Sequence, residues 1–419
     1  MSFLHRMFFF AVVFFSTTAT AMNLTKPYNV FFKPTVHKGD RWILSMLAET
    51  GIGHAKAFDD CGTTNPLRIW NRNQDAIAML NGFPESSPQG QLLDILEGAE
   101  IAPIDNNIRG HFLVCGDLKL NYSLGFGARY FLPLDFSIAA YLPAYSMTLK
   151  NVSWSDLTPA GTPGDPDARV KNYLTNNFFS NVFTLGDGLQ LGGWHRAGIG
   201  DLLIMAEWLR DFPQSREMLK NVRLNPRLGI SFPTGKKSDQ DKIFAPAFGT
   251  DGAYGAYFGG ELIVTLGSYF RCGFTVDLLH AFGNMRNWRI KTDPSQTDLL
   301  LLEKTCVFID WGLQQQFDLF IEFFNMRGFF LRTDYQFTKH GENIVIPQCN
   351  QFLSNIANTA EYREDWTAHE ILTKLGYDFG YRRDDSRVRP TLSLYAQVPV
   401  NGKRSVLFTT IGAILSFEF

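Results

Sequence analysis

The chain has 419 residues and a formal net charge of −2, which argues against a nucleic-acid partner because such partners select basic surfaces. Five cysteines, an odd number, argue against a disulfide scaffold. Phe and Tyr are abundant, with 38 and 14 residues. Beyond the N-terminal segment, however, no apolar run approaches the roughly 18 residues that a transmembrane helix needs.

The N-terminus has the pattern of a secretory signal peptide. His5 and Arg6 precede an apolar run from Met7 to Phe15, and Ala19-Thr20-Ala21 follows as an A-x-A cleavage site. We therefore expect residues 1–21 to be removed on export. Residues 22–40 are predicted to form a periplasmic lead-in, and residues 41–419 the folded barrel argued below.

The first predicted strand spans residues 41–58, with Trp42, Leu44 and Met46 on one face. Residues 59–108 then form a long and unusually apolar loop with short helices near 75–80 and 91–96. Loops of this length are commonly functional. Two alternatives stay open: the helices pack on one another above the strands, or they form a cap or plug that enters the mouth of the fold.

A second strand shows the clearest alternation of apolar and polar residues. The even-numbered residues from Phe112 to Tyr130 are mostly apolar, whereas Asp117, Lys119 and Arg129 lie at odd positions. In a membrane barrel the apolar face meets lipid and the polar face the lumen. A turn at Leu132-Pro133 leads to a third strand at 135–154, and a second apolar loop covers 155–197.

The next hairpin carries the most specific sequence motif. Strands at 198–210 and 222–232 contain the pattern GIGD … NPRLGISFPTG. This pattern resembles the outer-membrane channel family of the meta-pathway of phenol degradation, over residues 198–267. The resemblance implies a barrel linked to uptake of aromatic or other hydrophobic compounds.

Seven further strands continue the same period of two. They are predicted at 254–266, 269–282, 305–323, 329–338, 366–381, 387–398 and 406–419. The total is about 12, or 14 if a long loop hides a hairpin. An even number with both termini on one side is typical of bacterial barrels.

The last strand ends the chain at Phe419. Leu407, Ile411 and Leu415 lie on its apolar face, and Glu418 lies on the other. A closing strand with a terminal Phe resembles outer-membrane barrels, in which the assembly machinery reads this pattern. An ordinary edge strand of a soluble sandwich is the alternative. The whole pattern favours an all-β, transmembrane, antiparallel up-and-down barrel in lipid, in the outer membrane of a Gram-negative-type bacterium.

No catalytic or metal-binding pattern accompanies this fold. His54, His280, His340 and His369 lie near strand ends without a convincing Ser or acidic partner set, and no His/Cys cluster has zinc spacing. We predict a protein that is not an enzyme and uses no cofactor. Two alternatives stay open for Cys61 and Cys115: they form a disulfide bond in an oxidising compartment, or both are free thiols.

The polar face of the strands carries the predicted functional residues. Such charges must be paired or hydrated inside a narrow barrel. One interpretation is a water-filled pore with a wall of mixed charge, and the other is a salt-bridge network that fills a closed barrel. The predicted lumen-facing residues are Asp117, Lys119, Arg129, Asp201, Glu207, Arg223, Arg227, Glu261, Arg271, Asp277, Asp310, Asp318, Glu322, Arg332, Asp334, Lys374, Asp378 and Arg389.

The apolar loops predict a cover over the outer mouth. Contiguous apolar surface usually marks a contact or binding region, so we expect Trp70, Leu80, Phe178 and Phe179 to form part of a gate. The leading hypothesis is a passive channel for small solutes, hydrophobic or aromatic ones among them. The alternative is a structural or surface-contact protein with a filled, non-conducting barrel.

Overall fold

The computed structural model describes residues 42–98, 110–157, 176–325, 327–380 and 388–419. The predicted signal peptide and lead-in lie outside these residues. Within them, no helix is long and apolar enough to cross a membrane.

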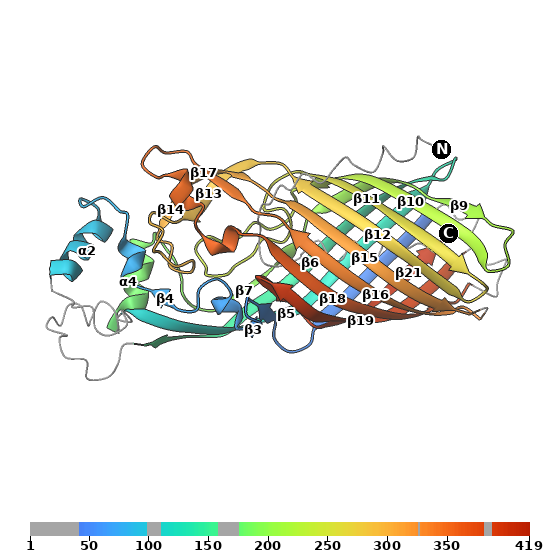
Figure 1. Cartoon of the computed structure of the whole chain (residues 1–419), viewed down its shortest axis with the longest axis horizontal. Coiled ribbons are helices and arrows are strands. Elements are labelled where there is room, and N and C mark those ends of the chain that lie inside the picture. The colour runs from blue at the N-terminus through green and yellow to red at the C-terminus, as the bar shows by residue number, and fades with distance from the viewer. Residues whose placement is uncertain (1–41, 99–109, 158–175, 326, 381–387) are drawn as a thin grey trace, which may run out of the picture.

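The described strands form a closed antiparallel barrel of 12 strands (Figure 1). One wall strand is made of three consecutive segments: β7 (Trp194–Ile199), β8 (Leu202–Trp208) and β9 (Arg210–Pro213). The pairing of β5 with β6 closes the ring. The other wall strands are β1 (Trp42–Gly51), β5 (His111–Phe131), β6 (Phe136–Asp156), β10 (Leu219–Phe232), β11 (Gly255–Leu266), β12 (Phe270–Ala281), β15 (Leu313–Phe324), β16 (Phe329–His340), β18 (Trp366–Asp378), β19 (Arg389–Lys403) and β21 (Thr410–Glu418).

The outer face of the barrel is apolar around its circumference. On most wall strands exposed apolar residues alternate with buried residues, as in Leu228 and Ile230 beside Gly229 and Ser231 on β10. Closure satisfies the backbone hydrogen bonds, so the barrel presents no free strand edge to a membrane. Trp42 packs against Tyr130 and pairs with Phe419 through the backbone, so this aromatic pair lies at the end that carries the C-terminus. We call this the inner end and the opposite, loop-bearing end the outer end.

Residue facing on β5 differs from the sequence prediction. The even-numbered Leu118 and Leu120 point inward and are buried, whereas Tyr122 and Phe126 are exposed. The register with β6 shifts between Leu120 and Tyr122. An extra residue of this kind is a β-bulge, which moves all later side chains to the other face. The even-numbered residues of β5 are therefore lipid-facing only in the inner half.

Three predicted strand boundaries are also wrong. The predicted strand 305–323 is two elements, because Trp311 and Gly312 separate β14 (Glu303–Asp310) from β15. The first strand ends at Gly51, not at 58. The last begins at Thr410, because β20 (Ser405–Leu407) pairs instead with β2 (Lys56–Phe58).

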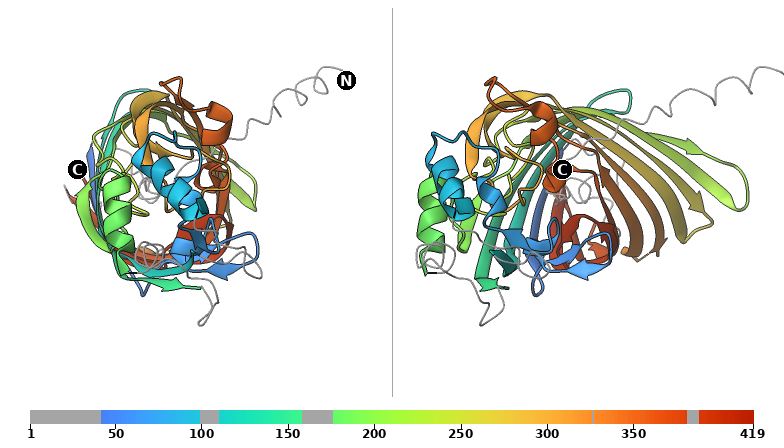
Figure 2. Two further views of the ribbon diagram at one scale, coloured as in Figure 1. Left: turned by 90° about the vertical axis from the view of Figure 1, so that its left-hand side faces the viewer. Right: turned by 60° about the vertical axis from the view of Figure 1, so that its left-hand side comes forward.

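The long loops fold together into a cap beyond the outer end of the barrel (Figure 1). The cap contains two small sheets, of which one joins β13, β14 and β17 and the other β20, β2 and β3. Seen from the loop end, α2 and α4 lie in front of the ring of strands (Figure 2). The remaining bounds are β3 (Thr63–Thr64), β4 (Gln74–Asp75), β13 (Asn284–Ile290), β17 (Ile344–Pro347), α2 (Pro88–Gly98), α4 (Phe178–Leu185), α5 (Ser354–Ala357), η1 (Pro66–Arg68), η2 (Ala78–Leu80) and η4 (Glu361–Arg363).

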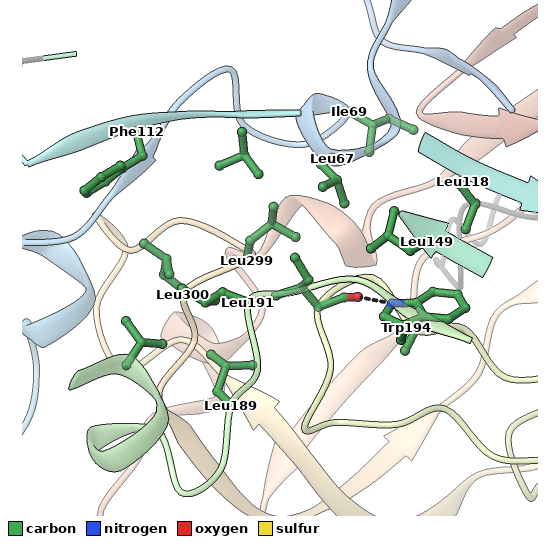
Figure 3. Packing of buried hydrophobic residues seen from close by; sticks show 14 of the residues in the cluster. Leu67, Ile69, Phe112, Leu118, Leu149, Leu189, Leu191, Trp194, Leu299 and Leu300 are labelled. Atoms are coloured by element: carbon green, nitrogen blue, oxygen red, sulfur yellow. Dashed lines mark hydrogen bonds between the residues drawn. The ribbon is translucent and has the colours of Figure 1, made fainter. Parts of the chain in front are cut away.

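A continuous hydrophobic core holds the cap on the barrel (Figure 3). Leucines from separate loops, among them Leu67, Leu189 and Leu299, belong to one buried cluster with Leu118 and Leu149 of the wall strands. Trp194 of β7 packs in the same core and donates its indole N–H to the carbonyl oxygen of Ile243 at 2.8 Å. The loop helices therefore form a cap, and their core reaches down to the barrel wall.

Candidate functional site

An apolar pocket of about 130 Å³ lies inside the cap, where five loops meet. Its walls belong to two hydrophobic clusters. Leu189, Ile243 and Leu299 come from the core described above. Trp288 and Trp311 come from a second core beneath the β13–β14–β17 sheet. The pocket therefore lies at the seam between two packed units of the cap.

Aromatic rings form much of the pocket wall. Trp70 packs against Phe244 and Tyr362, with ring centroids 5.0 and 5.7 Å away. Trp288 meets Trp311 edge-to-face at 6.0 Å. The Trp288 indole N–H donates to the Tyr362 hydroxyl at 2.8 Å, and that hydroxyl donates to the Arg289 carbonyl oxygen at 2.9 Å. Because these polar groups are already bonded, the rings turn apolar faces to the pocket.

Asp298 also borders the pocket, but its carboxylate is buried behind the wall and lacks a full set of partners. Its side chain is fully buried. Oδ2 accepts the backbone N–H of Glu361 at 3.2 Å, but Oδ1 accepts no hydrogen bond from any described residue. The nearest cation, Lys291 Nζ, lies 3.8 Å from Oδ1. By contrast Asp239, also in the wall, pairs with Lys242 at 2.6 Å.

Below the cap, paired charges line the inner wall of the barrel. Arg129 Nη2 donates to Glu207 Oε1 at 2.9 Å, and Arg227 Nη2 lies 3.0 Å from Asp277 Oδ1. These four side chains are at most 5% exposed. Each pair joins two wall strands that have one other strand between them, β5 with β8 across β6 and β10 with β12 across β11, so the charges neutralise one another without bulk water.

A cluster of large side chains fills the barrel at mid-height. Tyr141, Tyr257 and Tyr395 point inward from different sides of the ring and pack with Leu47 and Leu372. Tyr395 donates its hydroxyl to Glu49 at 2.8 Å, and Tyr257 donates to Asp277. All five residues are at most 5% exposed. In this conformation, the mid-height of the barrel is packed with side chains.

A second, smaller cavity of about 70 Å³ lies towards the inner end and is lined by charges. Arg271 Nη1 donates to Glu322 at 2.9 Å, and Arg332 Nη2 donates to Asp334 at 2.8 Å. Glu261 also lines this cavity, with both oxygens buried and without a hydrogen bond from a described residue. From the outer end to the inner end, the molecule thus contains an apolar pocket, a packed zone and a polar cavity.

The structure places most of the predicted lumen residues on the inner face of the barrel. Asp378, for example, is buried and accepts the backbone N–H of Gly380 at 2.8 Å. The residues on inward-facing positions are Arg129, Glu207, Arg223, Arg227, Glu261, Arg271, Asp277, Asp318, Glu322, Arg332, Asp334, Lys374, Asp378 and Arg389.

Three predicted lumen residues lie elsewhere. Asp117 and Lys119 are on the outward face of β5, because the bulge described above reverses the facing of its outer half. The carboxylate of Asp117 accepts the side-chain amide of Asn151 at 2.7 Å. Asp310 is exposed on β14, in a cap sheet rather than the barrel wall. All three placements are corrections to the sequence prediction.

Asp201 is buried, but it holds a loop in place. It accepts the backbone N–H of Gly235 at 2.8 Å and the Thr250 hydroxyl at 2.7 Å. The Thr234 hydroxyl donates in turn to the Gly200 carbonyl oxygen at 2.9 Å. The GIGD and PTG segments are therefore held together by hydrogen bonds at the outer rim, so the motif has a structural role.

The four predicted gate residues all lie in the cap, but in different settings. Trp70 lines the aromatic pocket. Leu80 and Phe178 are buried in the cap core, where Phe178 stacks on Phe112 at 4.4 Å. Phe179 is 52% exposed. Sequence reasoning missed the other pocket aromatics, which come from different loops: Phe244, Trp288, Trp311 and Tyr362.

The structure also places the cysteines and the candidate metal ligands. All five cysteines are free, so Cys61 and Cys115 form no bridge. Among the described residues, no three His, Cys, Asp or Glu side chains are grouped as a metal ion would require.

Comparisons with known proteins add fold-level likeness alone. No family model matches the sequence, and no curated protein matches it. An outer-membrane channel from Pseudomonas putida F1 aligns over 92% of this chain and 99% of its own, with 10% identity and a TM-score of 0.48. The Pseudomonas putida toluene transporter TodX aligns over 96% of both chains, with 9% identity and a TM-score of 0.34. LpxR from Salmonella typhimurium covers 90% of this chain and 100% of its own, with 11% identity and a TM-score of 0.29. At these values the likenesses carry no argument about substrate or activity.

The architecture itself defines the class. A closed, even-stranded antiparallel barrel with an apolar outer belt, short inner turns and long outer loops is an outer-membrane β-barrel. The predicted fold class and the barrel implied by the GIGD motif are therefore confirmed. Removal of a signal peptide and recognition of Phe419 by the assembly machinery stay predictions.

Proposed function

We infer that this protein is a passive outer-membrane channel for small apolar solutes with a single aromatic ring, which are captured first in the cap. The observation that carries this proposal is the pocket bounded by Trp70, Phe244, Trp288, Trp311 and Tyr362. Ligand pockets are typically concave, aromatic-rich and supplied with few polar groups. A cavity of about 150 Å³ holds benzene in another protein, and this one measures about 130 Å³.

Passage beyond the pocket requires side chains to move. The tyrosines at mid-height are buried in a packed cluster in this conformation, and the cap that carries Trp70, Leu80 and Phe178 lies beyond the outer end of the barrel. A solute of one ring needs a smaller opening than a hydrated ion. We therefore expect slow, selective passage of such solutes with little ionic conductance.

The packed mid-height also favours a second candidate function, a non-conducting barrel whose cap contacts a neighbouring cell or molecule. The two functions differ in solute flux. Neither needs a catalytic group, and we propose no enzymatic role.

Uptake by proteoliposomes tests the channel directly. Liposomes that contain the full-length protein should take up radiolabelled toluene faster than the same liposomes without it, after correction for diffusion through the lipid. Ala245→Trp places an indole into the pocket wall, where Ala245 is 8% exposed, and should remove most of this difference. Ala48→Trp, on the lipid-facing side of β1, is the matched control and should leave it unchanged. If the wild-type protein causes no uptake beyond that of protein-free liposomes, the channel function is excluded and the contact function remains.

A further inference from the structure

A patch of basic and hydrogen-bonding side chains lies on the outside of the wall where β5 and β6 leave the barrel. Both strands have 21 residues and continue beyond the barrel into the cap (Figure 1). Lys119 lies opposite Thr148 across these strands, and Thr148 lies opposite His195 of β7, so the three side chains share one face. The neighbouring Leu118 and Leu149 point the other way and are buried in the cap core. The row from Lys119 to His195 therefore faces outward.

The patch borders the lipid-facing belt directly. The next outward row towards the inner end contains Tyr122 of β5 and Ala197 of β7, which both lie opposite Ser146. Tyr122 is 44% exposed, and Ile199, one outward position further along β7, is 47% exposed and belongs to the apolar belt. Tyrosine is typical of the boundary between acyl chains and water. Lys119 therefore lies just outside that boundary, at the depth of the lipid headgroups.

Two lysines give this patch its charge. Lys150 lies opposite Asp117 in the register of β5 with β6, so it is the diagonal neighbour of Lys119, at a spacing of roughly 7–8 Å between Cα atoms. The Asp117 carboxylate accepts the side-chain amide of Asn151 at 2.7 Å and lies 4.0 Å from His54 Nε2. Within the described part of the chain, neither lysine forms an ion pair. Both ammonium groups are therefore available to one anionic group outside the wall.

Lysines elsewhere at the outer edge of the barrel are already neutralised. Lys339 on the outside of β16 lies 3.5 Å from Asp365. Lys403 at the end of β19 lies 4.0 Å from Asp60 and 3.8 Å from Asp365. The patch on β5 and β6 differs because the nearby Asp117 is bonded to a neutral amide instead. Its two lysines thus form a site for an anion at the membrane boundary.

We propose that this patch binds a phosphorylated acyl-sugar lipid of the outer leaflet, whose acyl chains lie on the adjoining apolar belt. A phosphate of the lipid is held between Lys119 and Lys150. The sugar hydroxyls meet Thr148 and His195, whose side chains are hydrogen-bonded to each other at 3.0 Å. A phospholipid supplies a phosphate but fewer hydroxyl groups, so the uncharged half of the patch favours the sugar headgroup. The site is separate from the aromatic pocket and concerns how the protein contacts its membrane.

Titration of the full-length protein in an uncharged detergent tests the proposal. The probes are diphosphoryl lipid A, which is a phosphorylated acyl-sugar lipid, the same lipid without its phosphates, and phosphatidylglycerol. The wild type should bind diphosphoryl lipid A about tenfold more tightly than either other probe, the effect of one charge-assisted hydrogen bond. Lys119→Gln combined with Lys150→Gln should weaken this binding about 25-fold, because each lysine near an anionic lipid surface contributes about fivefold.

A matched double variant at the other end of the barrel is the control. Arg216→Gln combined with Lys220→Gln removes the same charge from exposed residues in and beside the turn between β9 and β10, at the inner end, and should leave the affinity unchanged. Heat-modifiable migration on gels shows that each variant is folded. Equal affinity of the wild type for the lipids with and without phosphate, or undiminished binding by the Lys119 and Lys150 double variant, would overturn the proposal. Phosphatidylglycerol bound as tightly as diphosphoryl lipid A would overturn the choice of a sugar headgroup.

Discussion

Replacing Glu207 by alanine will destabilise the barrel by about 3–5 kcal/mol, the usual cost of removing one partner from a buried ion pair. Arg129 is the reason. Its guanidinium group is 5% exposed and makes two hydrogen bonds to Glu207, with a further bond to the Tyr141 hydroxyl. Without Glu207, the positive charge of Arg129 stays buried, and of these partners only the neutral Tyr141 hydroxyl remains to accept a hydrogen bond. Urea unfolding and refolding in lipid vesicles measures the loss.

Two comparisons show whether burial causes the effect. Asp60→Ala removes the acid of a pair with Arg404 in which the acid is 52% exposed, so the loss should stay below about 1 kcal/mol. Arg129→Met combined with Glu207→Leu removes both buried charges and should recover most of the stability lost in Glu207→Ala. A loss in Glu207→Ala no greater than that in Asp60→Ala would contradict the buried pair.

Combining Tyr257→Ala with Tyr395→Ala will turn a poorly conducting barrel into one with clear ionic steps in planar bilayers. These two rings lie in the mid-height cluster and are at most 5% exposed. Their removal leaves a cavity next to Glu49 and Asp277, to which their hydroxyls donate. A cavity lined by carboxylates that have each lost a hydrogen-bond donor will fill with water, and we expect this water to join the two halves of the barrel.

The same residue change on the lipid side is the control. Tyr335→Ala removes a ring that is 43% exposed on the outside of β16 and should leave conductance at the wild-type level. Heat-modifiable migration on gels confirms that each barrel is folded. If the inner double variant is folded and conducts no better than Tyr335→Ala, the mid-height cluster is not the barrier to ions.

The barrel could be predicted from the sequence because its signal is local. A period of two can be recognised from neighbouring residues alone. It recurs on β16, where alternate positions from Arg332 to Gln336 are inward and buried, and on β18 from Glu370 to Asp378. On β18 only Lys374 of these positions is half-buried. Lipid outside and packed side chains inside impose the same alternation on every strand. The number of strands and the facing of most charges follow from it.

The bulge on β5 could not be predicted, because one additional residue leaves the composition of the strand unchanged. The sequence shows continuous alternation from Phe112 to Tyr130, yet the buried positions change from Leu120 to Ser123. The cause is tertiary: the outer half of β5 turns its apolar side to the cap core, where Leu67 packs near Leu118. Asp117 and Lys119 were misplaced for this reason.

The pocket was missed because it depends on contacts between distant loops. Trp70, Trp288 and Tyr362 come from three loops, and their spacing along the chain carries no pattern. A weak signal existed in the segment NMRNWRI at 284–290, which forms β13 and carries Trp288. The apolar loops indicated that this region packs together, but which side chains share a cavity is decided by contacts between the loops.

Crystallographic soaking with a brominated single-ring hydrocarbon is the most direct test of solute capture in the cap. Anomalous scattering locates the bromine without reliance on the rest of the map. The proposed function predicts one strong peak in the pocket bounded by Trp70, Trp288 and Trp311, and its loss in Ala245→Trp. Bromine found only along the lipid-facing belt, with none in the pocket, would contradict the proposed capture site.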